Sequence, residues 1–271
     1  MTSEGNPKNL VQSLAKGFRV LEAFTATDTE FTLNDISVRT GLDSGTVFRM
    51  VHTLISLGHL QRVDNTRRFR LSLKVLDLGF NAIAQTDLRD MARPILWSLV
   101  GDVSEAASLA VLDGSDMVYL ERVHAGLARL GVDIRIGTRL PAYYTAVGHA
   151  VLAYLPGGAV LKVLNMCERV KFTPATPVNI EEITGCLERV RRQGYAVADP
   201  RVVLGLRVLA APVLDADGQS VAAISVAAPA MKVTLRKFVD QTAGPLLKAV
   251  ADMGKVMELS GAGSPGAVSA V

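Results

Sequence analysis

The amino-acid sequence predicts an α+β protein with two domains. Its 271 residues are enough to bury two separate hydrophobic cores. In the first quarter of the chain, apolar residues recur at steps of three and four, the period of amphipathic helices. From residue 105 onwards, strand-like runs joined by tight turns are mixed with helical stretches, and no internal repeat is present.

The composition indicates that any functional charge is local rather than global. Apolar residues make up 49% of the chain and charged residues 20%, with a net charge of +3, values that are ordinary for a globular protein. The N-terminal stretch MTSEGNPKNL lacks the apolar run of a signal peptide, and no apolar run reaches the length of about eighteen residues that suggests a membrane span. We therefore expect a cytoplasmic protein without a membrane partner.

The two cysteines, Cys167 and Cys186, have neither CxxC spacing nor histidine pairs nearby. This pattern does not suggest a disulfide framework or a zinc site, and we expect no metal and no cofactor. Both cysteines are typical of small buried apolar residues. Redox sensing is the weaker alternative, because no resolving partner is evident near either thiol.

Two helices are predicted before residue 42. Apolar residues from Leu10 to Phe24 form one face of the first helix. Thr32 is a plausible N-cap for a short second helix, which Thr40 and Gly41 end. Gly41 also lies where the chain reverses sharply, a position that favours a residue tolerant of positive φ.

A third helix and a hairpin complete a predicted winged helix-turn-helix. Ser44 can cap the helix and Gly58 ends it. The following HLQRV and RFRLS alternate like paired strands around the turn DNTR. The inward stripe of the third helix is predicted to consist of Val47, Met50, Val51, Leu54 and Leu57.

The outward face of the third helix suits the major groove of DNA. Arg49 offers the bidentate donors that match guanine, and Ser44 and Thr46 near the helix N-terminus can bond phosphates. The other residues predicted on this face are Gly45, His52, Thr53 and Ser56. We interpret the face as the base-reading surface of a protein that binds double-stranded DNA.

The hairpin carries Arg62, Arg67, Arg68 and Arg70 against the single acid Asp64. Such a surplus of positive charge can lie along a phosphate backbone or enter the minor groove. An exposed arginine run can also be a solvated strand edge, protected against strand addition by its charge. The combination of two helices, a tight turn and a basic hairpin favours DNA binding.

The second domain is predicted from turns and periodicity. Asp113 and Gly114 mark one hairpin, and Asp215 to Gly218 mark another. Two shorter strands are predicted at LARLGVDI and GYAVAD. Helical patterns follow the wing and recur between and after the predicted strands. They are KVLDLGFNAIAQTD, LRDMARPILWSLVGDVS, TAVGHAVLAYL, residues 179–193 and residues 233–259.

The sequence resembles the IclR family of bacterial transcriptional regulators from about Leu10 to Leu259. The resemblance implies a winged helix-turn-helix, a linker helix and a GAF-like effector domain, assembled as a homodimer or tetramer on a palindromic operator. One departure is Ser44 and Gly45, where the family often has a Lys-Ser pair. The segments that carry the resemblance are SLAKGFRVLEAF, LDSGTVFRMVHTLISLGHLQR, RRFRLSLKVLDLG, GTRLPAYYTAVGHAVLAYLP and GLRVLAAPVLDADGQSVAAISVAAP.

We expect the DNA-binding domain at residues 1–71, the linker helix at 72–87 and the effector domain at 88–259. The small and turn-forming residues of SGAGSPGAVSAV predict a disordered tail at 260–271.

The resemblance implies an effector pocket between one face of the sheet and the segment LPAYYTAVGHA. Four of its positions, Ala198, Val208, Ser225 and Ala227, lie on strands opposite that segment. Relatives that bind small carboxylates commonly hold an Asp, a Cys or Ser, and two Ser at these positions. Here only Ser225 is polar. Fewer polar groups and two tyrosines favour a planar, partly apolar ligand, and the segment resembles regulators of aromatic-acid catabolism. Carried over by position, the lining comprises Leu130, Val132, Ile134, Tyr143, Tyr144, Ala146, Val147, Gly148, Ala198, Val208, Ser225 and Ala227.

Structural roles compete with these assignments. Tyr143 or Tyr144 can be a packed aromatic with its hydroxyl satisfied, and Ser225 can serve only to bond a neighbouring strand. For His149, a surface position is favoured over a pocket donor.

Catalysis is not expected, because no GxSxG, HExxH, phosphate loop or paired-carboxylate motif is present. A DNA-binding protein whose second domain only forms oligomers, without an effector, remains an alternative to a ligand-responsive regulator.

Overall fold

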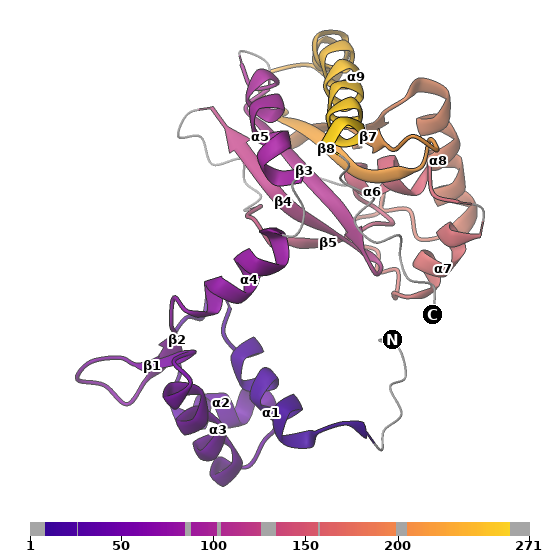
Figure 1. Cartoon of the computed structure of the whole chain (residues 1–271). Coiled ribbons are helices and arrows are strands. Elements are labelled where there is room, and N and C mark those ends of the chain that lie inside the picture. Colours follow the sequence, from indigo (N-terminus) through magenta and orange to yellow (C-terminus); the bar gives the residue numbers. More distant parts are fainter. Residues whose placement is uncertain are drawn as a thin grey trace. The chain divides into compact units, whose positions relative to one another are not determined.

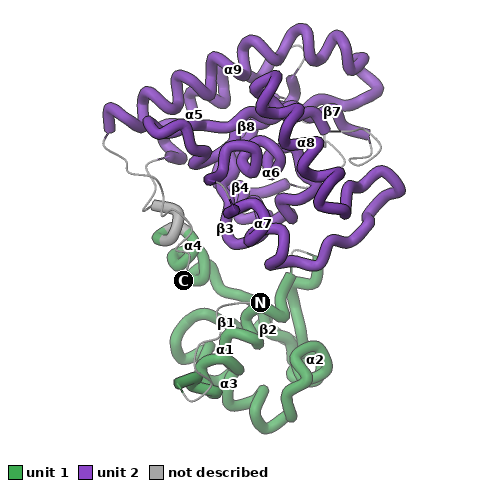
Figure 2. Tube along the Cα trace, turned by 90° about the vertical axis from the view of Figure 1, so that its right-hand side faces the viewer, with its two compact units in different colours: residues 1–85 green, residues 86–271 purple. Residues whose placement is uncertain are grey.

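The computed structural model describes residues 9–25, 27–84, 88–101, 104–125, 134–156, 158–198 and 205–260. The chain divides into two compact units, residues 1–85 and 86–271 (Figure 2). Among the described residues, no helix is long and apolar enough to cross a membrane.

The first unit is helical and carries a small two-stranded hairpin (Figure 1). Its core joins all three N-terminal helices through side chains such as Val20, Ile36, Val47 and Val51, which are fully buried. Its elements are α1 (Gln12–Glu22), α2 (Leu33–Thr40), α3 (Ser44–Ser56), β1 (Leu60–Arg62), β2 (Phe69–Leu71) and α4 (Val75–Ala84).

Helix α1 and the two residues before it present apolar side chains to solvent. Phe18 is 52% exposed, and Leu10, Val11 and Leu14 are exposed to a similar degree. Only the C-terminal end of the apolar face, at Val20 and Phe24, enters the core of this unit. This segment therefore has more apolar surface than the unit itself buries.

Helix α2 has the caps predicted from the sequence. The Thr32 hydroxyl accepts from the Asp35 amide, and the Asp35 carboxylate accepts from the Thr32 amide in return. Gly41 ends the helix with φ of 67°, a conformation that costs glycine little.

The predicted cap and stripe of α3 were partly wrong. Asp43, not Ser44, is the N-cap: its Oδ1 accepts from the Thr46 amide at 2.9 Å, and Ser44 is already helical. Leu57 was expected in the buried stripe but is 54% exposed. It follows the last helical residue, so its direction no longer obeys the helical period.

The hairpin is attached to the helices through its second strand. Leu60 pairs with Leu71 and Arg62 with Phe69. Phe69 also exchanges two backbone hydrogen bonds with Phe31, at 3.0 and 2.7 Å, in the segment before α2. The wing is therefore a continuation of the unit's hydrogen-bonded framework.

The described strands of the second unit form an antiparallel sheet in the order β5-β4-β3-β8-β7-β6. The two predicted hairpins are confirmed as β3–β4 and β7–β8, which turn at Gly114 and Gly218 with positive φ. The strand expected in LARLGVDI lies outside the described residues except at Ile134. The strands are β3 (Ala106–Asp113), β4 (Asp116–His124), β5 (Arg139–Pro141), β6 (Ala196–Val197), β7 (Leu206–Leu214) and β8 (Ser220–Pro229).

Helices cover both faces of this sheet. Helices α5 (Leu88–Ser98) and α9 (Leu235–Ser260) contact each other and one face (Figure 1). The opposite face packs against α6 (Ala146–Leu152), α7 (Ala159–Asn165) and α8 (Ile180–Gln193), with Ala110, Ala210 and Ala223 of the strands in the same core cluster. Ser260 is the last residue of α9 rather than part of a tail, and the rest of the predicted tail lies outside the described residues.

Gly148 allows α6 to lie directly against the loop that precedes it. A Cβ atom at this position would be 2.0 Å from the Ala142 carbonyl oxygen, far inside contact distance. The helix is held there by its cap, since the Gly148 amide donates to the Thr145 hydroxyl at 3.1 Å. Residue 148 must therefore be glycine for α6 to take this position.

Replacing Gly148 by alanine is expected to destabilise the second unit by at least about 2 kcal/mol, because backbone atoms rather than a flexible side chain must move. The measurement is urea unfolding followed by the fluorescence of Trp97, the single tryptophan, which lies in α5. Gly244→Ala is the control: it adds a methyl group in open space on α9 and should be neutral or stabilising by up to about 1 kcal/mol. Equal stability of the two variants would contradict the close-packing argument.

Candidate functional site

The first candidate site is the solvent-facing surface of α3. Among the residues predicted there, Ser44, Gly45, Arg49, His52 and Thr53 are exposed. This surface includes the first turn of the helix, where unpaired backbone amides and a positive dipole favour phosphate groups.

Thr46 was predicted on this surface and is instead buried, with 5% of its area exposed. Its hydroxyl accepts from Arg49 Nη2 at 3.3 Å. The residue therefore lies behind the surface and helps to orient the arginine. The outward assignment failed because α3 packs against both α1 and α2, so more of its surface is covered than one apolar stripe indicates.

The sequence argument missed an aromatic pair on the same surface. Phe48 is 50% exposed, and its ring centroid lies 4.4 Å from that of His52 one turn later. The signal was available in their i, i+4 spacing, which places them on one helical face. A solvated phenylalanine here offers an apolar surface of the kind that contacts thymine methyl groups.

The wing presents Arg62, Arg67, Arg68 and Arg70, all of them exposed. Arg62 lies over the Phe69 ring at 5.6 Å, and Arg68 Nη1 donates to the Glu30 carbonyl at 3.1 Å. The side chains of Arg62 and Arg68 are therefore held against the hairpin and against the segment before α2. Arg67 lies in the turn that joins the strands, at the end of the hairpin.

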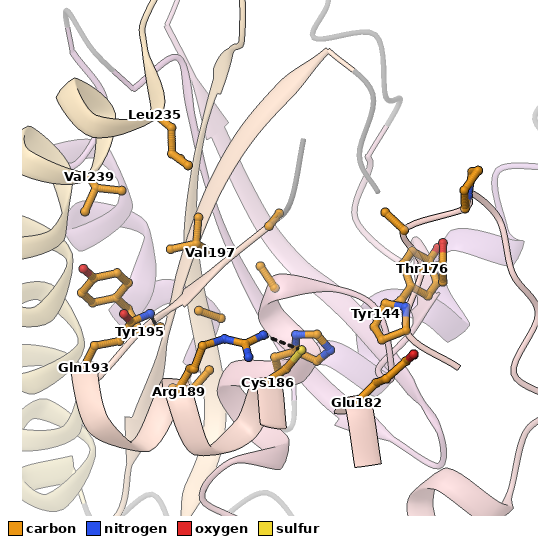
Figure 3. A pocket seen from close by; sticks show the side chains of 18 of the residues that line it. Tyr144, Thr176, Glu182, Cys186, Arg189, Gln193, Tyr195, Val197, Leu235 and Val239 are labelled. Carbon is orange, nitrogen blue, oxygen red and sulfur yellow. Dashed lines mark hydrogen bonds between the residues drawn. The ribbon is translucent and has the colours of Figure 1, made fainter. Parts of the chain in front are cut away.

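The second candidate site is a cavity of about 780 Å³ in the second unit. It lies between α6, α8, β6 and the start of α9, and Figure 3 shows its lining side chains. The lining comprises Tyr144, Ala146, His149, Lys171, Pro174, Ala175, Thr176, Pro177, Glu182, Cys186, Arg189, Val190, Gln193, Tyr195, Ala196, Val197, Ala198, Leu235 and Val239.

Three residues expected to line an effector pocket, Tyr144, Ala146 and Ala198, line this cavity. Tyr143 does not: it is 1% exposed, and its hydroxyl donates to the Val170 carbonyl at 2.6 Å. Val147 and Gly148 are likewise packed within the core.

Four further residues that were expected to line the pocket are described but do not line this cavity. Ile134 and Val208 are half-buried against the same core cluster. Ser225 and Ala227 are buried on β8, where Ala227 pairs with Val208. Leu130 and Val132 lie outside the described residues.

His149 was expected at the surface, and this was wrong. Only 8% of its area is exposed, and it lies on the cavity wall. Its Nε2 donates to the Tyr143 carbonyl at 2.7 Å; a carbonyl accepts only, so this nitrogen carries the proton. Burial lowers the pKa of His149, and the nearby Arg189 adds to this effect against the hydrogen bond to Tyr143.

Helix α8 contributes polar groups that the sequence argument did not select. Glu182, Cys186, Arg189 and Gln193 follow steps of three and four, so they share one face, and all four line the cavity. Arg189 Nη2 donates to the Cys186 sulfur at 3.0 Å (Figure 3). Burial raises the pKa of Cys186, which keeps the thiol protonated at neutral pH and opposes thiolate chemistry.

No group of three His, Cys, Asp or Glu side chains among the described residues is arranged to hold a metal ion.

Comparison with known proteins gives family matches for both units of the chain. Residues 80–254 match the family described as bacterial transcriptional regulator IclR C-terminal, and residues 13–64 match the IclR helix-turn-helix domain. The Pca regulon regulatory protein of Pseudomonas putida is 35% identical over 245 residues, which cover 90% of this chain and 83% of that protein. The regulator XynR of Escherichia coli is 30% identical, and the matched region covers 80% of this chain and 86% of XynR.

Two solved structures are similar over most of their length. A putative transcriptional regulator, RHA06195, from Rhodococcus sp. RHA1 has a TM-score of 0.80 and 32% identity, with coverage of 93% of this chain and 100% of that one. An IclR homolog from Microbacterium hydrocarbonoxydans complexed with 4-hydroxybenzoate has a TM-score of 0.77 and 26% identity. The match covers 91% of this chain and 99% of that one.

The fold and these matches define a transcriptional regulator with an N-terminal helix-turn-helix and a C-terminal effector domain of GAF-like fold. The relatives are regulators, and theirs is not a family of enzymes. The chain belongs to the IclR family.

The buried His149 makes the second unit sensitive to acid. Because its pKa is lowered in the folded state, the unfolded chain binds more protons below the usual histidine pKa of about 6.5. Stability should therefore fall as the pH drops through and below this value. His149→Gln, which keeps an N–H donor, should be less stable than the natural protein at pH 7.5 yet lose less between pH 7.5 and pH 5.

The measurement is urea unfolding followed by Trp97 fluorescence at the two pH values. The groups other than residue 149 are common to both proteins, so the difference isolates the histidine. An equal or steeper loss in the variant would contradict a lowered pKa.

Proposed function

We propose that this protein binds a palindromic operator in double-stranded DNA as a homodimer or tetramer, and that its affinity for DNA changes when a small aromatic carboxylic acid or related metabolite binds the second unit. In this proposal residues 1–71 bind DNA, residues 72–87 link the domains and residues 88–259 bind the effector. A DNA partner implies action in the cytoplasm.

The observation that carries the DNA-binding part is the coincidence of two basic surfaces in one unit. Arg49 on α3 and the arginines of the wing are exposed, and the wing is tied to the helices through Phe31 and Phe69. A helix can enter the major groove while a basic hairpin follows the adjacent phosphates or minor groove.

The oligomer is supported by apolar side chains that α1 and the two residues before it leave in solvent. Leu10, Val11, Leu14 and Phe18 are each more than half exposed. A contiguous apolar surface of this kind is costly in water and favours contact with another chain. Two recognition helices about 34 Å apart, or a multiple of it, would match a two-fold operator.

The effector part is supported by the cavity and by the relatives. The cavity is large enough for a small organic molecule, and aromatic and apolar side chains line much of it. A relative named for the Pca regulon and a structure containing 4-hydroxybenzoate favour an aromatic acid. We propose that such a ligand shifts an equilibrium between arrangements of the DNA-binding units through α4.

Arg49→Ala and Arg67→Ala should weaken DNA binding in different ways. Loss of Arg49 is expected to cost about 1 to 3 kcal/mol on the operator and to relax base preference, whereas loss of Arg67 should weaken all sequences alike and flatten the salt dependence. The measurement is fluorescence anisotropy with the gene's upstream DNA and a random duplex at several salt concentrations. Equal losses on both duplexes for Arg49→Ala would contradict base reading.

An aromatic effector should raise the thermal stability of the full-length protein. At a ligand concentration of one hundred times Kd, binding to the folded state alone contributes about 2.7 kcal/mol. Thermal melting with benzoate, 4-hydroxybenzoate and 3,4-dihydroxybenzoate is expected to show this rise, with glyoxylate as a small-acid control. A flat melting temperature with every compound would favour a second domain that only forms oligomers.

A further inference from the structure

Two polar side chains are neighbours on the wall of the cavity, one from α6 and one from α8. His149 and Arg189 both line the cavity. Burial lowers the pKa of His149, and Arg189 is near enough for its charge to lower that pKa further. Figure 3 shows the Arg189 side chain extending along the wall towards Cys186. A ligand in the cavity would therefore meet a guanidinium and an imidazole side by side.

One nitrogen of His149 has no hydrogen-bond partner among the described residues. Nε2 donates to the Tyr143 carbonyl at 2.7 Å, so it carries the proton. Because the pKa is lowered by burial, the imidazole is neutral at pH 7.5, and Nδ1 can only accept. The side-chain atoms of the described residues that are closed to solvent and lack a partner are His59 Nδ1 and Glu105 Oε2. His149 Nδ1 is not one of them, so this acceptor is open to the cavity that the residue lines.

Arg189 keeps most of its donors available. The hydrogen bond that the structure describes for it runs to the Cys186 sulfur at 3.0 Å, and a thiol sulfur is a weak acceptor. None of the ion pairs among the described residues includes Arg189. The charged lining residues are two cations, Lys171 and Arg189, and one acid, Glu182. The cavity wall therefore offers an anion a planar cation without a carboxylate partner.

We propose that Arg189 and His149 are the polar anchors of the cavity: the Arg189 guanidinium binds the carboxylate of an aromatic acid, and His149 Nδ1 accepts a hydrogen bond from a hydroxyl group on its ring. This inference rests on the proposed function and narrows the effector to a hydroxylated aromatic acid. Arg189 is not among the positions that the family resemblance indicated. His149 acts here as an acceptor, whereas the sequence suggested a donor as its role in a pocket.

The chemistry of the two anchors is complementary. A guanidinium is planar, keeps its charge and matches the two oxygens of a carboxylate with parallel N–H donors. An imidazole nitrogen that can only accept leaves a buried ligand group unpaired unless that group is a donor, such as a phenolic hydroxyl. Tyr144, Val197 and Ala198 supply aromatic and apolar surface on the same lining, suited to the ring that carries both substituents.

The test separates the two anchors by the choice of ligand. Isothermal titration calorimetry on the full-length protein at pH 7.5 uses the three monohydroxybenzoates and 3,4-dihydroxybenzoate. Each is compared with its amide, which lacks the charge, and with benzoate, which lacks the hydroxyl. At least one hydroxylated acid should bind at least about tenfold more tightly than its amide, because hydrogen bonds between charged partners are stronger. The same acid should bind at least about threefold more tightly than benzoate.

Variants of the two anchors should each remove one preference. Arg189→Gln is expected to reduce the preference for the acid over its amide to about twofold or less while the preference over benzoate persists. His149→Gln, which keeps an N–H for the Tyr143 carbonyl, and His149→Phe both lack Nδ1. Each should reduce the preference over benzoate to about twofold or less and retain that over the amide.

Arg192→Gln is the matched control. It removes the same charge from an exposed position of α8 that does not line the cavity, so both preferences should stay as in the natural protein. Either His149 variant that folds is sufficient. If neither folds, the ligand comparison on the natural protein and Arg189→Gln decide.

Several outcomes would overturn the inference while leaving effector binding intact. These are hydroxylated acids that bind no more tightly than benzoate or than their amides, and preferences that persist in the Arg189 or His149 variants. A loss in Arg192→Gln equal to that in Arg189→Gln would also overturn it, because the effect would then be one of net charge. Failure of every compound to bind the natural protein would instead overturn the effector part of the proposed function together with this inference.

Discussion

The close contact between α6 and the Ala142 carbonyl is the constraint on which the second unit depends. Gly148 permits it, and the Thr145 cap fixes where the helix begins. From that position Tyr144, Ala146 and His149 reach the cavity, while Val147 and Val151 fill the space above the sheet. The absence of a Cβ atom at Gly148 thus sets both the packing of the core and the shape of the cavity wall.

The two units use arginine in opposite environments. Wing side chains such as Arg67 are exposed to solvent. Salt screens their charge beyond about 10 Å, and their attraction to a polyanion is unselective. Arg122 lies on a covered sheet face with its direction fixed by Ser108. A partly buried charge is screened less than a charge in solvent and interacts more strongly with the groups around it.

Local signals in the sequence were sufficient for much of the fold. The Thr32 cap, the left-handed Gly41 and the turns at Gly114 and Gly218 act within a few residues, so they could be predicted without tertiary information. Asp43 was missed because it and Ser44 are both good caps, and the choice depends on where the chain leaves the turn after α2.

The candidate sites were less predictable because their residues are defined by contacts across the fold. Thr46 is buried although the helical period places it outward, and His149 lies on a cavity wall that it shares with residues of α8. The resemblance indicated Tyr144, Ala146 and Ala198 on the cavity but gave no indication of the polar face of α8. Arg122 and Ser108 become partners only through strand register, which composition and periodicity do not specify.

The turn of the wing has a further consequence for how this family member can diverge. Asn65, with φ of 58°, is the one non-glycine residue in the left-handed region among those that the structure describes. Because Phe69 pairs with both Arg62 and Phe31, a residue inserted beside Asn65 would lengthen the turn and leave the register of the two strands in place. A change in the length of this turn would therefore move its basic tip, including Arg67, relative to the strands that carry it.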